Sequence, residues 1–508
     1  MIRWSRLLAL VCAVPGSLEA QDSTRASPPA PLVSLSLEEA LSQARAHSPA
    51  YRQTLNNAAP ARWGVRNAYG SLLPSVTAAS DFGYTGSGRS NFGGGLTLPT
   101  SPFLTSGYSL GLEMQLSGRT LTAPAQQKAL QQATDEDISG AGVTLTSEIS
   151  TQYLNTLQAT AQVQVATQQV KRNQDFLALA QARHQVGQAT LLDVRQAEVT
   201  KASSDVALLR AVQAENEAKL DLLRRMGVEP PAPIEQIVLS DSFPVTTPNF
   251  QLDSLLALAD QYNPVLRSLQ ARGHAADLDV RAAKSEFLPS LAIRAGWGGF
   301  TQQFTNEDLL LQQTLGDAQA NAANCQFDNS VKSALSLGGE VGNCYSTYGL
   351  VDGGAALLDP VSQQIRTSNS TFPFHYTGQP FGASLTLTLP IFTGFGRSLR
   401  LSQARAQQDD ADEDVRARRL AVRSEVHARY LGLRTAFQAI AVQASSREAA
   451  RDQLRLAQER YRLGAGSALE VSDAQNNVQK AEGDYITAVY DYHKAIAALE
   501  AAVGRSLR

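Results

Sequence analysis

The sequence predicts a mixed α and β protein in which one structural unit occurs twice, and three observations carry this prediction. The first is an internal repeat, because LEEALSQARAHSP at Leu37 returns without a gap as LDSLLALADQYNP at Leu252. The second is a helical spacing of apolar residues over two very long stretches, and the third is a two-residue alternation of apolar and polar residues in shorter segments. Each half therefore contributes strands and a long antiparallel helical hairpin.

The two copies of the repeat differ in length. RHQVGQATLLDV at Arg183 matches RYRLGAGSALEV at Arg460, and this pair lies further apart than the pair at Leu37 and Leu252. The second copy therefore contains an insertion, which we assign to a long external loop at about 302–378. The expected organisation is a signal peptide (1–20), an N-terminal linker (21–36), a first repeat (37–228), an inter-repeat linker (229–251) and a second repeat (252–508).

The first 20 residues have the composition of a secretory signal peptide. Arg3 and Arg6 precede an apolar run from Leu7 to Val14, and small residues follow as far as Ala20. Beyond that point no stretch approaches the roughly 20 apolar residues that a spanning helix requires. We therefore expect an exported protein that enters a membrane, if at all, through strands.

The charged and nucleophilic residues do not form a catalytic pattern. A net charge of −3 gives no electrostatic reason to bind nucleic acid. The six histidines are scattered singly, and periodicity brings together no Ser-His-Asp set, Cys-His pair or carboxylate dyad. The GSGRSNFGGG segment near Gly86 lacks the Lys-Ser/Thr of a phosphate-binding loop and is expected to be a flexible turn. The sequence predicts no enzyme, cofactor or metal site.

The long stretches are expected to be helices of unusual length. Val422, Val426 and Tyr430 begin a run of apolar residues at three- and four-residue steps, which is the pattern of one helix face. A helix from about Arg397 to Leu463 would measure about 100 Å at 1.5 Å per residue, and its first-half counterpart would run from about Pro124 to Val186. Coiled-coil-like packing of such helices through small residues fits the abundance of alanine.

Two equivalent turns should join the long helices into hairpins. In each turn a glycine suits the left-handed conformation that ends a helix. A hydroxyl residue three positions later can cap the next helix, and an acidic residue three positions further on completes a capping box. These residues build a turn whether or not they also bind a partner. They are Gly187, Thr190 and Asp193 in the first repeat, and Gly464, Ser467 and Glu470 in the second.

The alternating segments are expected to be strands with one apolar and one polar face. The clearest examples begin at Ser109 and Ser384, and less regular partners begin at about Ser75 and Ser290. About ten alternating residues suit a tilted membrane strand with lipid on one side and water on the other. A soluble sandwich would alternate in the same way, so the pattern alone leaves both open.

The number of strands constrains the membrane interpretation. Two halves supply four strands, which cannot close a barrel, and an open edge in hydrocarbon leaves unpaired backbone groups at several kcal/mol each. A membrane protein of this design must therefore share one barrel among several chains. The number of chains does not follow from this argument.

Four kinds of motif, most of them present twice, resemble one known family. They are Ser48-Pro49 and Asn263-Pro264, the LLPS and FLPS segments at Leu72 and Phe287, the LTLPIFTGFGR turn at Leu387, and the R-[HY]-x-[VL]-G-x-x-[TS] hairpin tips. Across essentially the whole mature sequence the chain resembles the TolC-like outer-membrane efflux proteins. It departs from their pattern near Gly118, where the first half lacks the P-x-F-x-G core.

The resemblance implies a homotrimer whose chains share one transmembrane β-barrel, in contact with outer-membrane lipid, and whose hairpins form a periplasmic α-barrel. It implies an exit duct that passively conducts substrates from an inner-membrane transporter, joined by a periplasmic adaptor (membrane fusion) protein. The hairpin tips would then be the periplasmic mouth and the adaptor-docking surface. Efflux of small toxic molecules and secretion of proteins remain equally compatible with it.

Two rival classes remain open. A secreted structural protein of the envelope, built from coiled-coil hairpins and a β-sandwich, would show the same periodicities and would be soluble without detergent. An envelope enzyme is the weaker rival, because no residue constellation supports it.

Cys325 and Cys344 are predicted to form a disulfide within the long external loop. They are the only cysteines that remain after signal cleavage, and they face an oxidising compartment.

Overall fold

The computed structural model describes residues 33–92, 96–370 and 372–507. The predicted signal peptide, 1–20, and most of the predicted N-terminal linker, 21–36, therefore lie outside the described residues. Among the described helices, none has an apolar stretch long enough to cross a bilayer.

The chain divides into two compact units, each assembled from segments that are distant in the sequence. Parts of the two longest helices, α4 (Gly118–Gln185) and α11 (Gly396–Arg462), belong to each unit. The first unit contains residues up to Arg52, Thr144–Phe250 and Ala428–Ala501, and the second contains Gln53–Val143, Gln251–His427 and Ala502–Arg508.

The predicted long helices are confirmed, with one difference at the start of α4. Helix α11 begins and ends within one residue of the prediction. Helix α4 begins at Gly118 rather than near Pro124, because Ser117 caps it: Ser117 Oγ accepts from Thr120 N at 3.3 Å, and Ser117 N donates to Thr120 Oγ1 at 2.7 Å. A proline six residues into the helix is therefore not its start.

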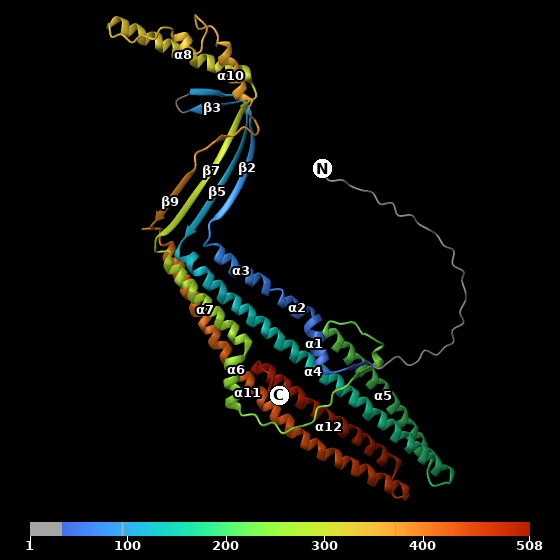
Figure 1. The fold of residues 1–508 in the computed structure, drawn as a ribbon. Coiled ribbons are helices and arrows are strands. Elements are labelled where there is room, and N and C mark those ends of the chain that lie inside the picture. The colour runs from blue at the N-terminus through green and yellow to red at the C-terminus, as the bar shows by residue number, and fades with distance from the viewer. Residues whose placement is uncertain (1–32, 93–95, 371, 508) are drawn as a thin grey trace, which may run out of the picture. The chain divides into compact units, whose positions relative to one another are not determined.

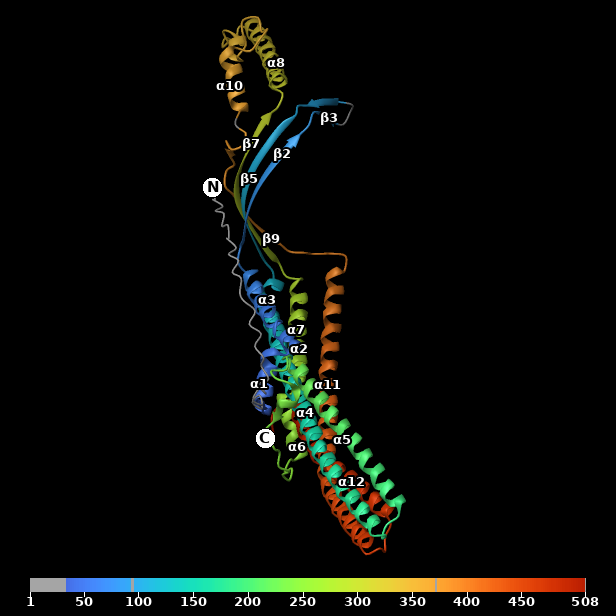
Figure 2. The same cartoon turned by 90° about the vertical axis from the view of Figure 1, so that its right-hand side faces the viewer.

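In the first unit, two helical hairpins pack against each other. Helices α4 and α5 (Leu191–Met226) form one hairpin, and α11 and α12 (Ala468–Val503) form the other (Figure 2). Their shared core consists mainly of alanine and valine, with Phe176 and Tyr461 as its aromatic members. Small side chains allow the four helices to approach closely, which is the packing that the alanine-rich composition predicted.

Each predicted linker contributes a short strand to the first unit. Strand β1 (Val33–Leu35) pairs in parallel with β6 (Ile237–Leu239), next to the 3₁₀ turn η1 (Ile234–Gln236). The buried Tyr153 donates its hydroxyl to Leu35 O at 2.8 Å and so ties β1 to α4. Burial, together with the neighbouring Asp241, raises the pKa of Tyr153 above its ordinary value, which keeps this donor protonated.

The second unit contains the main sheet. Strands β2 (Ser75–Thr85), β5 (Phe103–Leu116) and β7 (Ser290–Phe304) lie side by side and antiparallel (Figure 1). The free side of β7 pairs with two short segments, β8 (Thr377–Gly378) and β9 (Gly382–Thr388), which together form an interrupted fourth strand. The predicted four-strand contribution is confirmed. Within the described residues, no strand pairs with the outer side of β2 or β9.

The register gives this sheet one apolar and one polar face. Met114 lies opposite Ile293 on the apolar face. Glu113 lies opposite Arg294 on the other, where their side chains form an ion pair of 2.9 Å. The alternation in the sequence therefore describes the sheet correctly.

The segment near Gly86 is not the flexible turn that its glycines suggested. Strands β3 (Gly88–Phe92) and β4 (Leu96–Thr100) form an antiparallel hairpin, and β5 already begins at Phe103. Most glycines of the segment fall between β3 and β4 at residues 93–95, outside the described residues. The two flanking segments are strands because they pair with each other, from Gly88 opposite Thr100 to Phe92 opposite Leu96.

The insertion at 302–378 is helical rather than an open loop. It contains α8 (Glu307–Ala334), α9 (Cys344–Thr347) and α10 (Asp359–Asn369), and the structure joins Cys325 to Cys344. Asn369 fixes the end of α10 to β7, because its side chain accepts from Phe304 N at 2.7 Å and donates to Phe304 O at 2.9 Å. The small core of the inserted segment contains Ala318, Ala322 and Leu350.

Shorter helices flank α4 and α11. The first repeat supplies α1 (Leu37–His47), α2 (Pro49–Leu55) and α3 (Ala58–Gly70), and the second supplies α6 (Leu252–Tyr262) and α7 (Pro264–Ser285). In the second unit, the Asn-Pro motif starts α7: Asn263 Oδ1 accepts from Leu266 N at 3.1 Å, and Asn263 Nδ2 donates to Ala502 O at 3.0 Å. The motif therefore both caps a helix and binds the end of α12.

Candidate functional site

The two hairpin tips have the same backbone geometry. Gly187 and Gly464 have φ angles of +77° and +79°, the left-handed region that glycine occupies without strain. Each is the C′ residue of a Schellman motif, in which two backbone bonds close the helix end. These bonds are Gly187 N to His184 O (3.0 Å), Gln188 N to Arg183 O (2.8 Å), Gly464 N to Tyr461 O (3.1 Å) and Ala465 N to Arg460 O (2.9 Å).

The helix that follows each tip is capped by the predicted hydroxyl residue. Thr190 Oγ1 accepts from Asp193 N at 3.2 Å, and Thr190 N donates to Asp193 Oδ2 at 2.9 Å, which makes a full capping box. Ser467 Oγ accepts from Glu470 N at 3.2 Å, while Glu470 Oε2 lies 3.4 Å from Arg460 Nη1. The two acidic residues therefore bind different partners.

Arg183 and Tyr461 connect the two tips, and sequence reasoning did not single them out. The guanidinium of Arg183 lies 4.7 Å from the centre of the Tyr461 ring and donates to the Tyr461 carbonyl. Burial of Tyr461, and after it the Asp193 carboxylate, raise the pKa of this phenol. Both residues belong to the duplicated R-[HY]-x-[VL]-G-x-x-[TS] motif, so the repetition itself was the signal that could have identified them.

Large apolar side chains are exposed at both tips. An exposed cluster of this kind commonly marks a surface that binds another protein. Val186 and Leu192 of the first tip correspond in the repeat to Leu463 and Leu469 of the second, so the duplication has kept the pattern. The exposed residues are Val186, Leu191, Leu192, Leu463 and Leu469.

A buried polar layer lies between the hairpins behind the tips. Glu482 of α12 is buried and accepts from Arg172 of α4 at 3.4 Å and from Arg451 of α11 at 3.2 Å. Arg172 also donates to the buried Gln169 at 2.7 Å. Three helices are thus joined through one carboxylate, which fixes their relative register.

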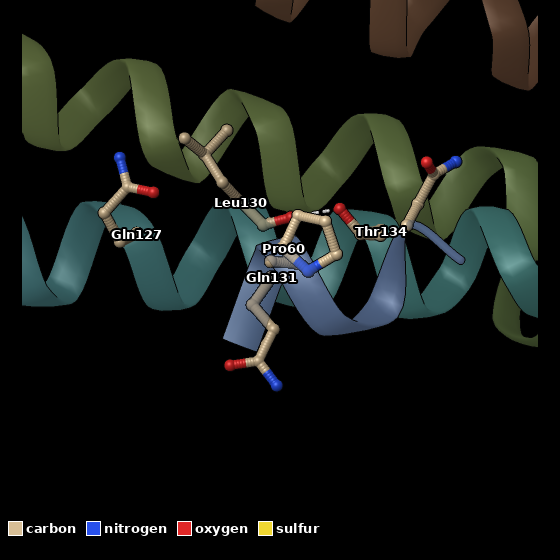
Figure 3. Close-up of a pocket in the computed structure, with 7 residues that line it drawn as sticks. Pro60, Gln127, Leu130, Gln131 and Thr134 are labelled. Atoms are coloured by element: carbon tan, nitrogen blue, oxygen red, sulfur yellow. Dashed lines mark hydrogen bonds between the residues drawn. The ribbon is translucent and has the colours of Figure 1, made fainter. Parts of the chain in front are cut away.

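The second unit has a hollow between α3 and α4 that carries no comparable chemistry. Figure 3 shows Pro60 of α3 facing Leu130 and its neighbours on α4. None of the seven lining residues is titratable; they are Asn57, Pro60, Ala61, Gln127, Leu130, Gln131 and Thr134. Across the described residues, no group of three His, Cys, Asp or Glu side chains is placed to hold a metal ion.

The hairpins and the sheet, whose outer strands β2 and β9 have no further partner among the described residues, define the class of fold to which the chain belongs. The sequence model of one family, described as outer membrane efflux protein, matches residues 40–228 and 361–505. The chain belongs to this family.

Known proteins support the same assignment. The chain is 26% identical over 216 residues to the cation efflux system protein CusC of Escherichia coli, a match that covers 42% of this chain and 46% of CusC. It is 28% identical over 196 residues to the toluene efflux pump outer membrane protein TtgF of Pseudomonas putida, covering 37% of this chain and 39% of TtgF. These matches span less than half the length of either relative.

Among solved structures, the outer-membrane channel OprN matches with a TM-score of 0.67 and 17% sequence identity. The match covers 92% of this chain and 89% of OprN. This likeness is one of fold, and it extends over both units.

Proposed function

We propose that this protein is the outer-membrane channel of an efflux or secretion system and passively conducts substrates to the cell exterior. The observation that carries the proposal is the sheet of β2, β5, β7 and β9, which has one apolar face and leaves both outer edges unpaired in the described part of the chain. A sheet of this kind can face lipid only if neighbouring chains pair its edges. Family membership supports the same function.

The proposed assembly is a homotrimer whose three sheets close one barrel in the outer membrane. The hairpins of the first unit would line the periplasmic part of the duct. In mild detergent, cross-linking and native mass measurement should find a trimer in the outer-membrane fraction. A stable, folded monomer that is soluble without detergent would refute the shared barrel and favour a secreted structural protein of the envelope.

The hairpin tips are the proposed docking surface for a periplasmic adaptor protein, which would join the channel to an inner-membrane transporter. The exposed apolar residues at the tips and the charged pair formed by Arg460 and Glu470 support this proposal. Cysteines placed at Val186 and Leu463 should cross-link to a periplasmic adaptor protein in intact cells. Cross-linking no stronger than from an exposed helical position such as Leu420 would refute docking at the tips.

The cargo can be tested directly. One relative is named for cation efflux and another for toluene efflux. A deletion strain should therefore be exposed to metal cations and to toluene, with the wild-type gene restored as control. Sensitivity to neither, together with normal secretion of proteins, would refute the proposed transport role.

A further inference from the structure

The longest helix of the inserted segment, α8, has one face buried in the segment and an opposite face that is exposed. On the buried face, Ala318 and Ala322 belong to the core of the segment, and Asn329 Oδ1 accepts from Val341 N at 2.8 Å. On the opposite face, the side chain of Phe327 is 71% exposed and that of Val331 is 37% exposed. A helix with apolar residues on both faces is typical of one that packs against elements on both sides.

The exposed face has the spacing by which one helix packs against another. Its residues recur at steps of three and four, so they lie along one side of the helix. They are apolar or small, and small side chains allow two helix backbones to approach closely. All of them are exposed in the described chain. These residues, the α8 stripe, are Gly316, Ala320, Ala323, Phe327, Val331 and Ala334.

The residues beside the α8 stripe are almost uncharged, which favours a second copy of α8 as its occupant. Most of them are amides, namely Gln319, Asn324 and Gln326, and only Asp317 carries a charge. In a parallel bundle, residues on one side of the stripe meet those on the other side of the neighbouring helix, so Asp317 does not face its own copies. A strongly charged partner would find no opposite charges along this face.

The inserted segment is held to the sheet at both of its ends. At its start, directly after β7, Asn306 Oδ1 accepts from Leu309 N at 3.1 Å and caps α8. At its end, Asn369 binds both backbone groups of Phe304. Strand β7 is the neighbour of β9, whose outer side must pair with another chain in the proposed barrel. The copies that complete the sheet therefore bring their α8 helices to the same rim.

The base of the inserted segment lies on the polar side of the sheet. Gln302 and Phe304 share a face with Arg294, because side chains alternate along β7. The same two residues line a hollow together with Leu310 of α8 and Ile365 of α10. The polar face is the inner face of the proposed barrel. Helix α8 therefore starts on the side of the lumen and not on the side of the lipid.

The dimensions of the mouth and of the helices agree. Three sheets of four strands, with strands about 4.8 Å apart and tilted by about 40°, close a barrel about 24 Å across. Three touching helices of about 10 Å diameter each fill a circle about 22 Å across. Helix α8 has 28 residues and so extends about 42 Å. Three copies that start at the inner rim are therefore large enough to cover the mouth.

We propose that the α8 stripes of three copies pack together into a cap over the external mouth of the channel, and that this cap limits the size of the cargo that leaves. The proposal rests on the proposed trimeric outer-membrane channel. It gives the inserted segment two roles: it is a contact between subunits in addition to the shared sheet, and it is a size filter at the exit.

Cross-linking of the full-length protein in intact cells tests the contact. Ala320→Cys is oxidised with copper phenanthroline while the native disulfide stays oxidised, and we expect most chains to migrate as dimers on a non-reducing denaturing gel. Ser333→Cys is the matched control, because Ser333 is also exposed on α8 but lies about 140° around the helix from Ala320. It should give several-fold less dimer.

Access to the lumen tests the cap. Ser384→Cys places a thiol on the polar face of β9, opposite Arg294, and intact cells are treated with a small maleimide or with one that carries a long polyethylene-glycol chain. Ala320→Glu would place three carboxylates around one axis, so it should accelerate labelling by the long reagent several-fold without changing the rate of the small one. Ser333→Glu should change neither rate.

The outcomes separate the cap from the channel. If Ala320→Cys gives no more dimer than Ser333→Cys, or links to a different protein, while native mass measurement still finds a trimer, the α8 contact is overturned and the channel stands. Equal labelling by the long reagent with and without Ala320→Glu would overturn the size filter. Absence of the trimer in the unaltered protein would refute the channel as well. In every variant, Cys325 and Cys344 must stay blocked, which shows that the inserted segment has folded.

Discussion

The substitution Gly464→Val perturbs the left-handed backbone turn at one hairpin tip without introducing a steric clash. A Cβ atom added at Gly464 would meet only Arg183 Nη2 within 4 Å, at 3.7 Å, which is an ordinary van der Waals distance. No neighbouring atom therefore obstructs the new side chain. The cost arises in the backbone, whose φ of +79° is unfavourable for any residue with a Cβ atom.

The size of this cost can be bounded in two ways. Holding valine in the left-handed region costs about 1–2 kcal/mol. Leaving that region would break the two Schellman bonds, Gly464 N to Tyr461 O and Ala465 N to Arg460 O, at about 1 kcal/mol each. The two routes give about 1–2 kcal/mol, which lowers the equilibrium constant between the native and the altered tip by a factor of roughly 5 to 30.

A matched pair of alanine variants tests whether the backbone conformation decides the sign of the stability change. Gly483 lies inside α12, has no positive φ, and has nothing within 4 Å of an added Cβ atom. Gly483→Ala should stabilise the protein by about 0.5–1 kcal/mol, as in other helix interiors. Gly464→Ala should destabilise it by about 1 kcal/mol, so the same chemical change has opposite signs at the two positions.

The functional assay measures tolerance of the compound to which the deletion strain is sensitive, trimer abundance in the outer-membrane fraction and cross-linking to the adaptor. Gly464→Val should lose resistance and cross-linking but keep normal trimer abundance, because the strain is confined to the tip. The equivalent Gly187→Val should behave alike. Normal resistance and normal cross-linking in both variants would show that the native tip conformation is not required for adaptor docking or export.

Three further predictions concern other parts of the chain. Thiol labelling of the denatured, unreduced protein should find Cys325 and Cys344 blocked, and two labelled sites would contradict the disulfide. The bond, with a sequence separation of 19, should stabilise the inserted module by about 3 kcal/mol. Tyr153→Phe removes the hydrogen bond to Leu35 O, which should destabilise the pairing of β1 by about 1 kcal/mol and accelerate its hydrogen exchange. Unchanged exchange would show that the hydroxyl does not hold the strand. Glu482→Gln leaves two arginines without their shared carboxylate and should lower the free energy of unfolding by about 2 kcal/mol. Glu470→Gln, at an exposed pair, should lower it by less than about 0.5 kcal/mol. Equal effects of the two variants in chemical unfolding would refute the importance of the buried layer.

Features that depend on local sequence were predicted well. The end of α11 at Arg462 follows from the glycine two residues later, and the start of α5 follows from Thr190 and Asp193. The alternation in β5 and β9 correctly separated the two faces of the sheet. In each case the determining residues lie within a few positions of one another, so propensity and hydrogen bonding within one turn or strand are sufficient.

Features that depend on distant contacts were missed or only partly predicted. Glycine content near Gly86 hid the β3–β4 hairpin, since pairing rather than composition makes those residues strands. The inserted segment was expected to be a loop, yet it contains α8 and α9, which a disulfide joins, and α10, whose Asn369 binds β7. The parallel pairing of β1 with β6 joins two predicted linkers and has no local signal.

The sequence alone determined the duplication, the hairpins, the two-faced strands and the family, because repetition and periodicity are properties of one chain taken in order. Only the tertiary structure showed that Arg183 of one repeat binds Tyr461 of the other, and that Arg172 and Arg451 share the buried Glu482. In a sequence, an arginine indicates no more than a surface charge. Its role is decided by which carbonyls and rings the fold brings within reach of its guanidinium, and that depends on contacts between segments far apart in the chain.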